Sequence, residues 1–173
     1  MQAMTLPSLA TGEQVAFKRD LVGWIVVILN TLMALNAANF FLGMLKTSVS
    51  DWLMMNTCTP VIVLFVIGFL LASPALMVAG AALMFRYGTL GLFVFSWSGG
   101  NLIAQAGHIL MTLAVVYVTA DVIRNRRWKA LRWGLLLAIV LLIPLTIVQK
   151  MWVDANPEMA EELFSGTLTL PGQ

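Results

Sequence analysis

The sequence predicts an all-α integral membrane protein with four transmembrane helices joined by short loops. Of its 173 residues, 60% are hydrophobic and only 10% are charged, and the mean hydropathy is +0.91. Soluble domains carry about 25% charged residues, because their whole surface faces water. The apolar residues also form contiguous runs and do not alternate with polar ones, which favours helices over membrane-spanning strands. Together these observations predict a multi-pass protein of the cell (inner) membrane.

Uncharged stretches set the number of expected spans. Asp, Glu, Lys and Arg are absent from residues 21–45, 52–85, 87–120 and 133–149. A helix needs about 20 apolar residues to cross a hydrocarbon core of about 30 Å. We therefore expect four spans, at about 21–45, 60–85, 92–120 and 133–153. The chain 1–173 is then a single membrane domain, with a polar N-terminal arm (1–20) and an acidic C-terminal tail (154–173).

The first span is expected to be retained. It follows twenty residues that include four charged ones, and no short apolar core with a small-residue cleavage site precedes it, so it does not resemble a cleaved signal peptide. The link 46–59 is predicted to hold one or two turns lying in the membrane interface. In the second span, Pro74 is expected to cause a kink, with Ser73 able to satisfy the freed carbonyl.

The boundary between the second and third spans is expected at RYGTLG (86–91), whose glycines suit a tight turn. The uncharged run 87–120 is too long for one untilted crossing, and SWSGGN interrupts it at 96–101. Two explanations remain open. Either the helix starts near Trp97, with 88–96 forming an interfacial or re-entrant piece, or a long tilted helix is broken near Gly99-Gly100.

A cluster of cations predicts the orientation. The segment after the third span carries five of them, which short cytoplasmic loops favour: Arg124, Arg126, Arg127, Lys129 and Arg132. With four spans this loop shares a side with Lys46, so six cations oppose the four of the other side. We expect the basic loop in the cytoplasm and both termini on the non-cytoplasmic side. An odd number of spans would instead separate the termini.

A polar stripe runs along the third span. Asn101, Gln105, His108 and Thr112 are spaced four, three and four residues apart, so they share one helical face. The first span adds three amides, Asn30, Asn36 and Asn39. Amide and hydroxyl side chains in a bilayer need partners, and small residues let helices approach each other. The amides, Thr112, Gly99 and Gly100 are therefore predicted to make helix-packing or partner contacts.

His108 also permits a cofactor hypothesis. It is the only histidine, and an ionisable residue inside a membrane is a functional candidate. Ala104 and Gly107 beside it leave room for a flat macrocycle. His108, with Gln105 and Asn101, is thus a candidate site for a haem or chlorophyll-type pigment, with His108 as axial ligand, or for a quinone. The alternative is a neutral imidazole bonded to an amide, with no cofactor at all.

Catalytic signatures are missing from the sequence. It has no nucleophile elbow, no H-E-x-x-H and no glycine-rich phosphate loop, and its single cysteine, Cys58, excludes an intrachain disulfide. A net charge of +2 does not favour a nucleic-acid partner. We therefore expect no enzyme activity from this chain alone.

Three functions remain. The favoured one is a non-catalytic accessory or structural subunit of a multi-subunit inner-membrane complex, of the bioenergetic or the secretion and conjugation type. The partners would then be membrane lipids and other membrane subunits. The alternatives are a membrane anchor that binds a haem, a chlorophyll-type pigment or a quinone through His108, and a small oligomeric transporter or channel component.

Overall fold

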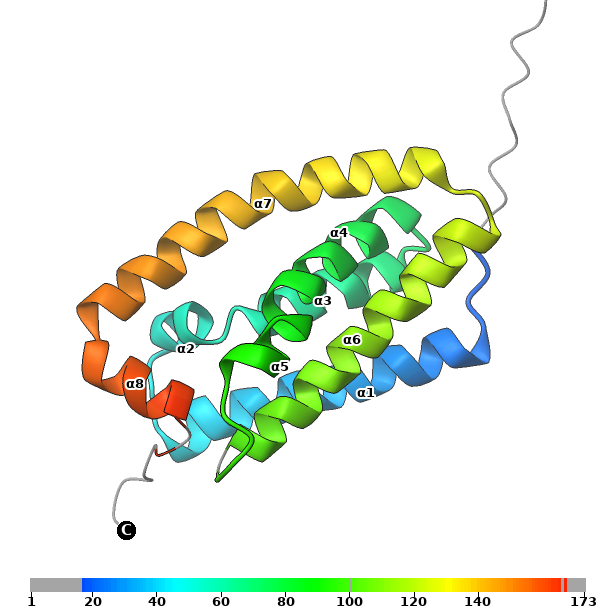
Figure 1. The fold of residues 1–173 in the computed structure, drawn as a ribbon. Coiled ribbons are helices and arrows are strands. Elements are labelled where there is room, and N and C mark those ends of the chain that lie inside the picture. The colour runs from blue at the N-terminus through cyan, green and yellow to red at the C-terminus, as the bar shows by residue number, and fades with distance from the viewer. Residues whose placement is uncertain (1–16, 100, 166, 168–173) are drawn as a thin grey trace, which may run out of the picture.

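The computed structural model describes residues 17–99, 101–165 and 167, and the regular elements among them are all helical (Figure 1). In chain order these are α1 (Leu21–Ala38), the π-helical η1 (Asn39–Met44), α2 (Val49–Met55), α3 (Cys58–Leu70), α4 (Pro74–Met84), the π-helical η2 (Phe85–Thr89), α5 (Gly91–Val94), α6 (Asn101–Arg124), α7 (Trp128–Ala155) and α8 (Pro157–Ser165). The all-α prediction is confirmed for this part of the molecule.

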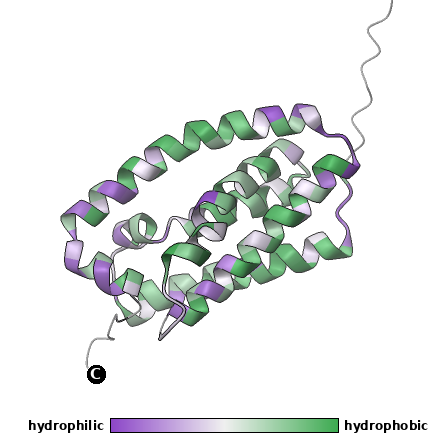
Figure 2. Ribbon diagram, viewed as in Figure 1, coloured by the Kyte–Doolittle hydropathy of each residue, from purple (hydrophilic) through white to green (hydrophobic). Residues whose placement is uncertain are grey.

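In the described part of the chain, four helical segments are long and apolar enough to cross a membrane: Leu21–Met44, Pro74–Val94, Asn101–Arg124 and Trp128–Ala155. The short helices α2 and α3 pass the same test together, although an 85° bend separates them, so they could form a fifth crossing. Figure 2 shows the apolar residues along the middle of the long helices and the polar ones mostly toward their ends. These segments suit a multi-pass membrane protein.

The predicted second span, 60–85, is wrong. Its two halves are separate helices, α3 and α4, which pack side by side in opposite directions (Figure 1). Pro74 does not kink a continuous helix. It is the first residue of α4, and the Ser73 hydroxyl caps this helix by accepting a hydrogen bond from the Leu76 N–H at 3.5 Å. A Ser-Pro pair suits this position because the serine caps free N–H groups and proline has none to satisfy.

Glycines bring α3 and α4 into backbone contact. A Cβ built on Gly68 would lie 2.7 Å from the Met77 nitrogen, and one built on Gly80 would lie 2.8 Å from the Phe65 Cα. Only glycine fits at such distances, since the neighbouring atoms belong to the backbone and cannot move aside. These two close contacts, on either side of the turn, hold the hairpin together.

The predicted turn at 86–91 is also wrong. This stretch continues α4 through η2 into α5, and the helical segment ends only at Val94. The chain turns instead at residues 95–99, where Gly99 has a φ of 54°, and α6 begins at Asn101. The first part of the run 87–120 therefore belongs to the preceding segment, up to Val94. The break expected near Gly99-Gly100 coincides with this turn, whereas the helix start expected near Trp97 lies four residues later, at Asn101. The third span moves from 92–120 to Asn101–Arg124.

Part of the acidic tail is helical. Residues Pro157–Ser165 form α8, and Ala160 is buried in a small apolar cluster with Phe41, Met55 and Trp152. This cluster lies where η1, α2 and the end of α7 meet. Gly166, residues 168–173 and residues 1–16 of the predicted N-terminal arm lie outside the described part of the chain.

The bundle has two electrostatically different ends, which α6 connects. Its C-terminal half approaches residues 17–20, because the Tyr117 hydroxyl donates to Asp20 at 3.0 Å. Its first residue approaches α8, because the Asn101 amide donates to the Phe164 carbonyl at 3.1 Å. We call these the basic end and the acidic end. The basic end carries seven cations: Lys18, Arg19, Arg124, Arg126, Arg127, Lys129 and Arg132. The acidic end includes Asp154 and the three glutamates of α8.

This arrangement changes the charge count by side. The basic loop shares its end of the bundle with Lys18 and Arg19, and not with Lys46 as four simple crossings require. Arg19 is fixed there because it donates to the Phe69 and Leu70 carbonyls at the end of α3, at 3.2 and 2.6 Å. The chain entering α1 and the chain leaving α7 therefore lie at opposite ends. The expectation that both flanks share one side does not fit this packing.

Candidate functional site

The polar stripe of α6 faces the interior of the bundle. Asn101, Gln105 and His108 keep only 6%, 1% and 5% of their surface exposed. Residues on the opposite face of α6, such as Leu102 and Ile103, are 54% and 61% exposed. We call Asn101, Gln105, His108 and Thr112 the α6 ridge. Its first three polar side chains are removed from solvent and Thr112 is half-buried, so these groups need protein partners.

Gln105 connects His108 to the segment between α5 and α6. Its Nε2 donates to the Phe95 carbonyl at 2.8 Å, and its Oε1 lies 3.1 Å from His108 Nδ1. Because the amide nitrogen is committed to a carbonyl, the amide oxygen must be the acceptor. The proton of a neutral imidazole is therefore assigned to Nδ1, and Nε2 carries the lone pair.

The other ring nitrogen of His108 faces Cys58, at the start of α3. The Cys58 sulfur lies 3.9 Å from His108 Nε2 and 3.8 Å from the Tyr87 carbonyl oxygen, both within reach of a weak S–H donor. One face of the ring rests on Gly91, where a built Cβ would lie 2.7 Å from the imidazole Cε1. Phe95 also packs against the ring, with centroids 5.2 Å apart. Three elements thus enclose the imidazole.

Asn101 joins α6 to the C-terminal helix. Its Nδ2 donates to the Ser96 hydroxyl and to the Phe164 carbonyl, each at 3.1 Å. Ser96 in turn donates to the Ser165 carbonyl at 2.7 Å. At the other end of the ridge, Thr112 donates to the His108 carbonyl at 2.8 Å and pairs with Thr89 of η2 at 3.0 Å. The ridge is therefore a chain of contacts between α6 and three neighbouring segments.

The amides of the first span divide between two faces. Asn30 is buried at 1% exposure, and its Nδ2 donates to the Val26 carbonyl at 2.9 Å and to the Leu110 carbonyl of α6 at 3.2 Å. Asn36 and Asn39 are exposed and, within the described residues, their side chains make no hydrogen bond. The predicted packing contact holds inside the chain for Asn30 alone.

The remaining predicted contact residues lie elsewhere. Gly99 is exposed in the turn before α6, while Gly100 lies outside the described residues. In the basic loop, Arg127 pairs with Asp121 at 2.8 Å and lies over the Phe17 ring. Arg124, Arg126, Lys129 and Arg132 are in contrast not buried.

The cofactor hypothesis meets a closely packed imidazole. A macrocycle bound to Nε2 would have to displace Cys58 and the backbone around Gly91, which already contact the ring. Ala104 and Gly107, which were expected to leave room for a macrocycle, do not border the ring. Ala104 is exposed, and Gly107 approaches Met33 of α1. Among the described residues, no group of three or more His, Cys, Asp or Glu side chains could hold a metal ion.

Sequence reasoning missed Cys58, Gly91, Phe95 and Phe164 as neighbours of the ridge. A half-buried cysteine and a glycine carry no spacing signal of their own, and their contacts with α6 arise only when distant segments fold together. Comparisons with known proteins add no assignment, because no protein family, curated protein or solved structure matches this chain. The geometry of the ridge is that of a structural network: donors and acceptors from four segments satisfy one another.

Proposed function

We propose that this chain is a non-catalytic accessory subunit of a multi-subunit inner-membrane complex, and that the outer face of α1 and η1 contacts a partner subunit. The observation that carries this proposal is the exposure of Asn36 and Asn39 on an apolar, membrane-length helix. We call these two residues the outer amide pair. Both are polar groups on a surface that lipid would otherwise cover.

Hydrocarbon offers no hydrogen-bond donors or acceptors to the outer amide pair. The neighbouring Leu32 and Leu35 are 55% and 61% exposed, so this face of α1 is apolar around the amides. An amide in hydrocarbon without a hydrogen-bond partner costs roughly 4–8 kcal/mol relative to water. A helix of another chain can supply the missing donors and acceptors. Gly43, which lies under the Asn39 side chain and is itself exposed, leaves the backbone open to close approach.

A second exposed polar group lies within a membrane-length segment. Arg86, in η2, is exposed and stacks over the ring of Tyr87, with 5.7 Å between its guanidinium carbon and the ring centroid. Among the described residues no carboxylate pairs with it. A guanidinium inside a membrane either extends to the interface or meets a partner. Arg86 therefore favours further protein contact, although less strongly than the amides do.

The α6 ridge supports a structural role over a cofactor role. Both nitrogens of His108 already face protein groups, and Gln105 and Asn101 use their amide protons on carbonyl and hydroxyl acceptors. A haem, pigment or quinone would have to replace these contacts. The accessory function needs no such rearrangement.

The proposed orientation places the basic end in the cytoplasm. Short loops rich in Lys and Arg stay on that side, and the basic end holds seven of the ten cations with only Asp20 and Asp121 as described acids. Residues 17–20 would then be cytoplasmic and α8 would lie on the opposite side.

Native mass spectrometry after purification in mild detergent tests the proposal. We expect the wild-type chain to carry partner chains in fixed stoichiometry. The double variant Asn36→Leu/Asn39→Leu should lose these partners while its amount in the membrane stays unchanged. Thr31→Val is the matched control on the same helix, because the Thr31 hydroxyl donates to its own helix at Val27, at 2.8 Å, and needs no external partner.

Four results would contradict this function. One is a wild-type chain that purifies alone; another is a double variant that keeps its partners. The third is a Soret or bacteriochlorin absorption band that His108→Ala abolishes, which would favour the cofactor anchor. A ring of identical chains that conducts ions would point to the transporter component.

A further inference from the structure

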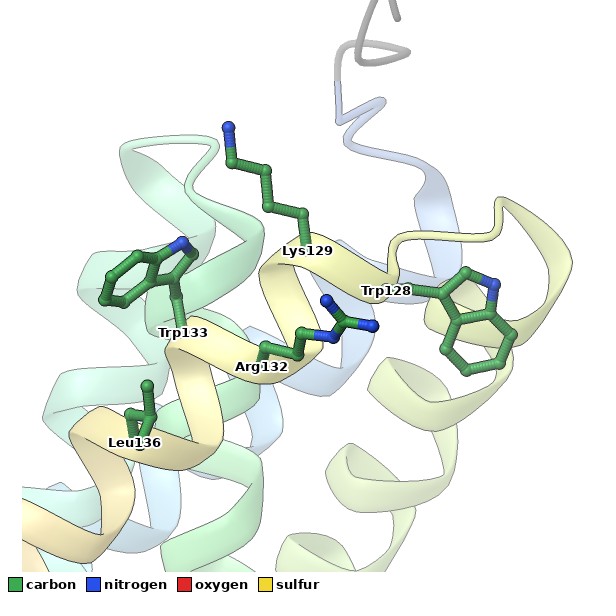
Figure 3. Close-up of a pocket in the computed structure, with 5 residues that line it drawn as sticks. All are labelled: Trp128, Lys129, Arg132, Trp133 and Leu136. Carbon is green, nitrogen blue, oxygen red and sulfur yellow. The ribbon is translucent and has the colours of Figure 1, made fainter.

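The start of α7 forms a groove with an unusual combination of side chains. Trp128, Lys129, Arg132, Trp133 and Leu136 line it, and its volume is about 540 Å³ (Figure 3). Two ridges of the helix make the groove, since residues 128, 132 and 136 follow each other at intervals of four and residues 129 and 133 run beside them. We call these five residues the α7 groove.

The α7 groove is open, and its cations are unpaired among the residues that the structure describes. Trp128 and Trp133 are 50% and 61% exposed, although tryptophan is a large apolar side chain. Figure 3 shows the Arg132 guanidinium extending toward the Trp128 indole, with Lys129 pointing away from the bundle between the two tryptophans. Within the described residues, neither Lys129 nor Arg132 has a carboxylate partner. The nearby Asp121 is already occupied by Arg127 and Asn125.

The groove leads from the basic end onto an apolar helix face. Leu136, Ile139 and Val140 follow along α7 and are 54%, 56% and 65% exposed. A ligand that matches this surface carries negative charge at one end and a long apolar portion at the other. Tryptophan indoles prefer the boundary between headgroups and hydrocarbon, and Lys and Arg bind phosphate oxygens there.

We propose that the α7 groove binds one anionic phospholipid, with its phosphate between Lys129 and Arg132, its glycerol region between the two tryptophans and an acyl chain along Leu136. This inference rests on the proposed membrane location, but not on the partner contacts of the outer amide pair. Each cation near an anionic membrane surface contributes about 1 kcal/mol, which is about a fivefold change in affinity. Removing both cations should weaken binding about 25-fold.

Lipid titration of the purified full-length chain in detergent, followed by native mass spectrometry, tests the site. The probes are phosphatidylglycerol, phosphatidylcholine and inorganic phosphate. We expect one phosphatidylglycerol to bind more tightly than phosphatidylcholine, and the double variant Lys129→Gln/Arg132→Gln to lose this preference. The matched control is Arg124→Gln/Arg126→Gln, which removes two exposed cations from the same end but outside the groove.

Melting temperatures in phosphatidylcholine show whether the variants are as stable as the wild type when no anionic lipid is present. The groove variant should melt with the wild type there, since neither side chain makes a hydrogen bond or ion pair among the described residues. Only the stabilisation by added phosphatidylglycerol should disappear. A second variant, Trp128→Leu, should weaken phosphatidylglycerol binding while leaving every charge in place. If Trp128→Leu and the charge variant both weaken phosphatidylglycerol binding, the lipid binds in the α7 groove and not to the basic surface as a whole.

The overturning results are distinct. Equal losses in the groove variant and in the control would mean that only the overall field of the basic end attracts lipid. Equal binding of phosphatidylcholine and phosphatidylglycerol would remove the role of the cations. Inorganic phosphate that competes at the same concentration as the lipid would make this a free-phosphate site. None of these outcomes affects the native-mass result for the outer amide pair, so the two proposals fail separately.

Discussion

The α6 ridge and the outer amide pair of α1 contain the same kinds of side chain in the same kind of apolar helix, yet they differ in every contact. Gln105 is 1% exposed and bonded at both ends of its amide, whereas Asn36 and Asn39 are exposed and, within the described residues, bonded to nothing. The polarity of a side chain within a span therefore does not define its role. The direction in which the side chain points does, because inward groups stabilise the chain and outward groups require another molecule.

The largest expected effect is that of Gln105→Leu. This change leaves His108 Nδ1–H and the Phe95 carbonyl without partners in a buried region, and each unsatisfied group costs about 1–3 kcal/mol. We expect the melting temperature in detergent to fall clearly. Ala106→Leu, on the exposed face of α6, is the control and should leave the melting temperature unchanged. Equal melting of the two variants would mean that the ridge does not stabilise the bundle.

Gly91→Ala should have the next largest effect. The added Cβ would lie within 2.9 Å of three atoms of the His108 ring, which Gln105 and Cys58 hold in place. Overpacking of this kind costs about 1–3 kcal/mol. Thermal unfolding measures this loss of stability. Removing the ring with His108→Ala in the same chain should restore part of the loss. If Gly91→Ala melts like the wild type, the imidazole is not enclosed as described.

Asn101→Ala should have a smaller and more local effect. The hydrogen bonds to Ser96 and to the Phe164 carbonyl are lost, but these partners are half-buried, so water can replace part of the contact. We expect a loss of about 1–2 kcal/mol at most. Amide hydrogen exchange should accelerate in α8 and stay constant in α7. Unchanged exchange in α8 would show that Asn101 does not hold this helix.

The smallest effect on the isolated chain is expected for the outer amide pair. Asn36→Leu/Asn39→Leu removes no internal hydrogen bond among the described residues, so the melting temperature of the chain alone should stay the same. A surface change of this kind alters stability by about 0.5 kcal/mol or less. The melting temperature of Gln105→Leu, which is expected to fall, is the comparison for this measurement. A large loss of stability in the outer double variant would place these amides inside the bundle and erase the difference.

Hydropathy located much of the fold from sequence alone. The first and fourth spans, expected at 21–45 and 133–153, correspond to Leu21–Met44 and Trp128–Ala155, because nothing but apolar length decides such segments. The second and third were misplaced since hydropathy cannot distinguish a kinked helix from two helices. Ser73-Pro74 fits both, and the deciding feature is the backbone contact at Gly68 and Gly80, which only the folded pair reveals.

The candidate site was predicted in part. The spacing of the α6 ridge correctly placed its members on one face, and that face is buried. Its partners could not be predicted, because Cys58 and Phe164 come from distant segments. The spacing of the α1 amides also indicates two separate faces. Asn30 and Asn36 are six residues apart, which separates them by about 120° around a helix, so the three amides of this span could not all share one interface.

The most direct test of the proposed partner contact compares lipid exposure along α1 with that along α7. Single spin labels at positions 36, 39 and 139, in a Cys58→Ala background, should all collide with lipid-dissolved oxygen when the isolated chain is in a bilayer. In the purified complex, the labels at 36 and 39 should become shielded while the label at 139 stays accessible. Labels at 36 and 39 that remain equally accessible in the complex would contradict the claim that the outer amides contact a partner subunit.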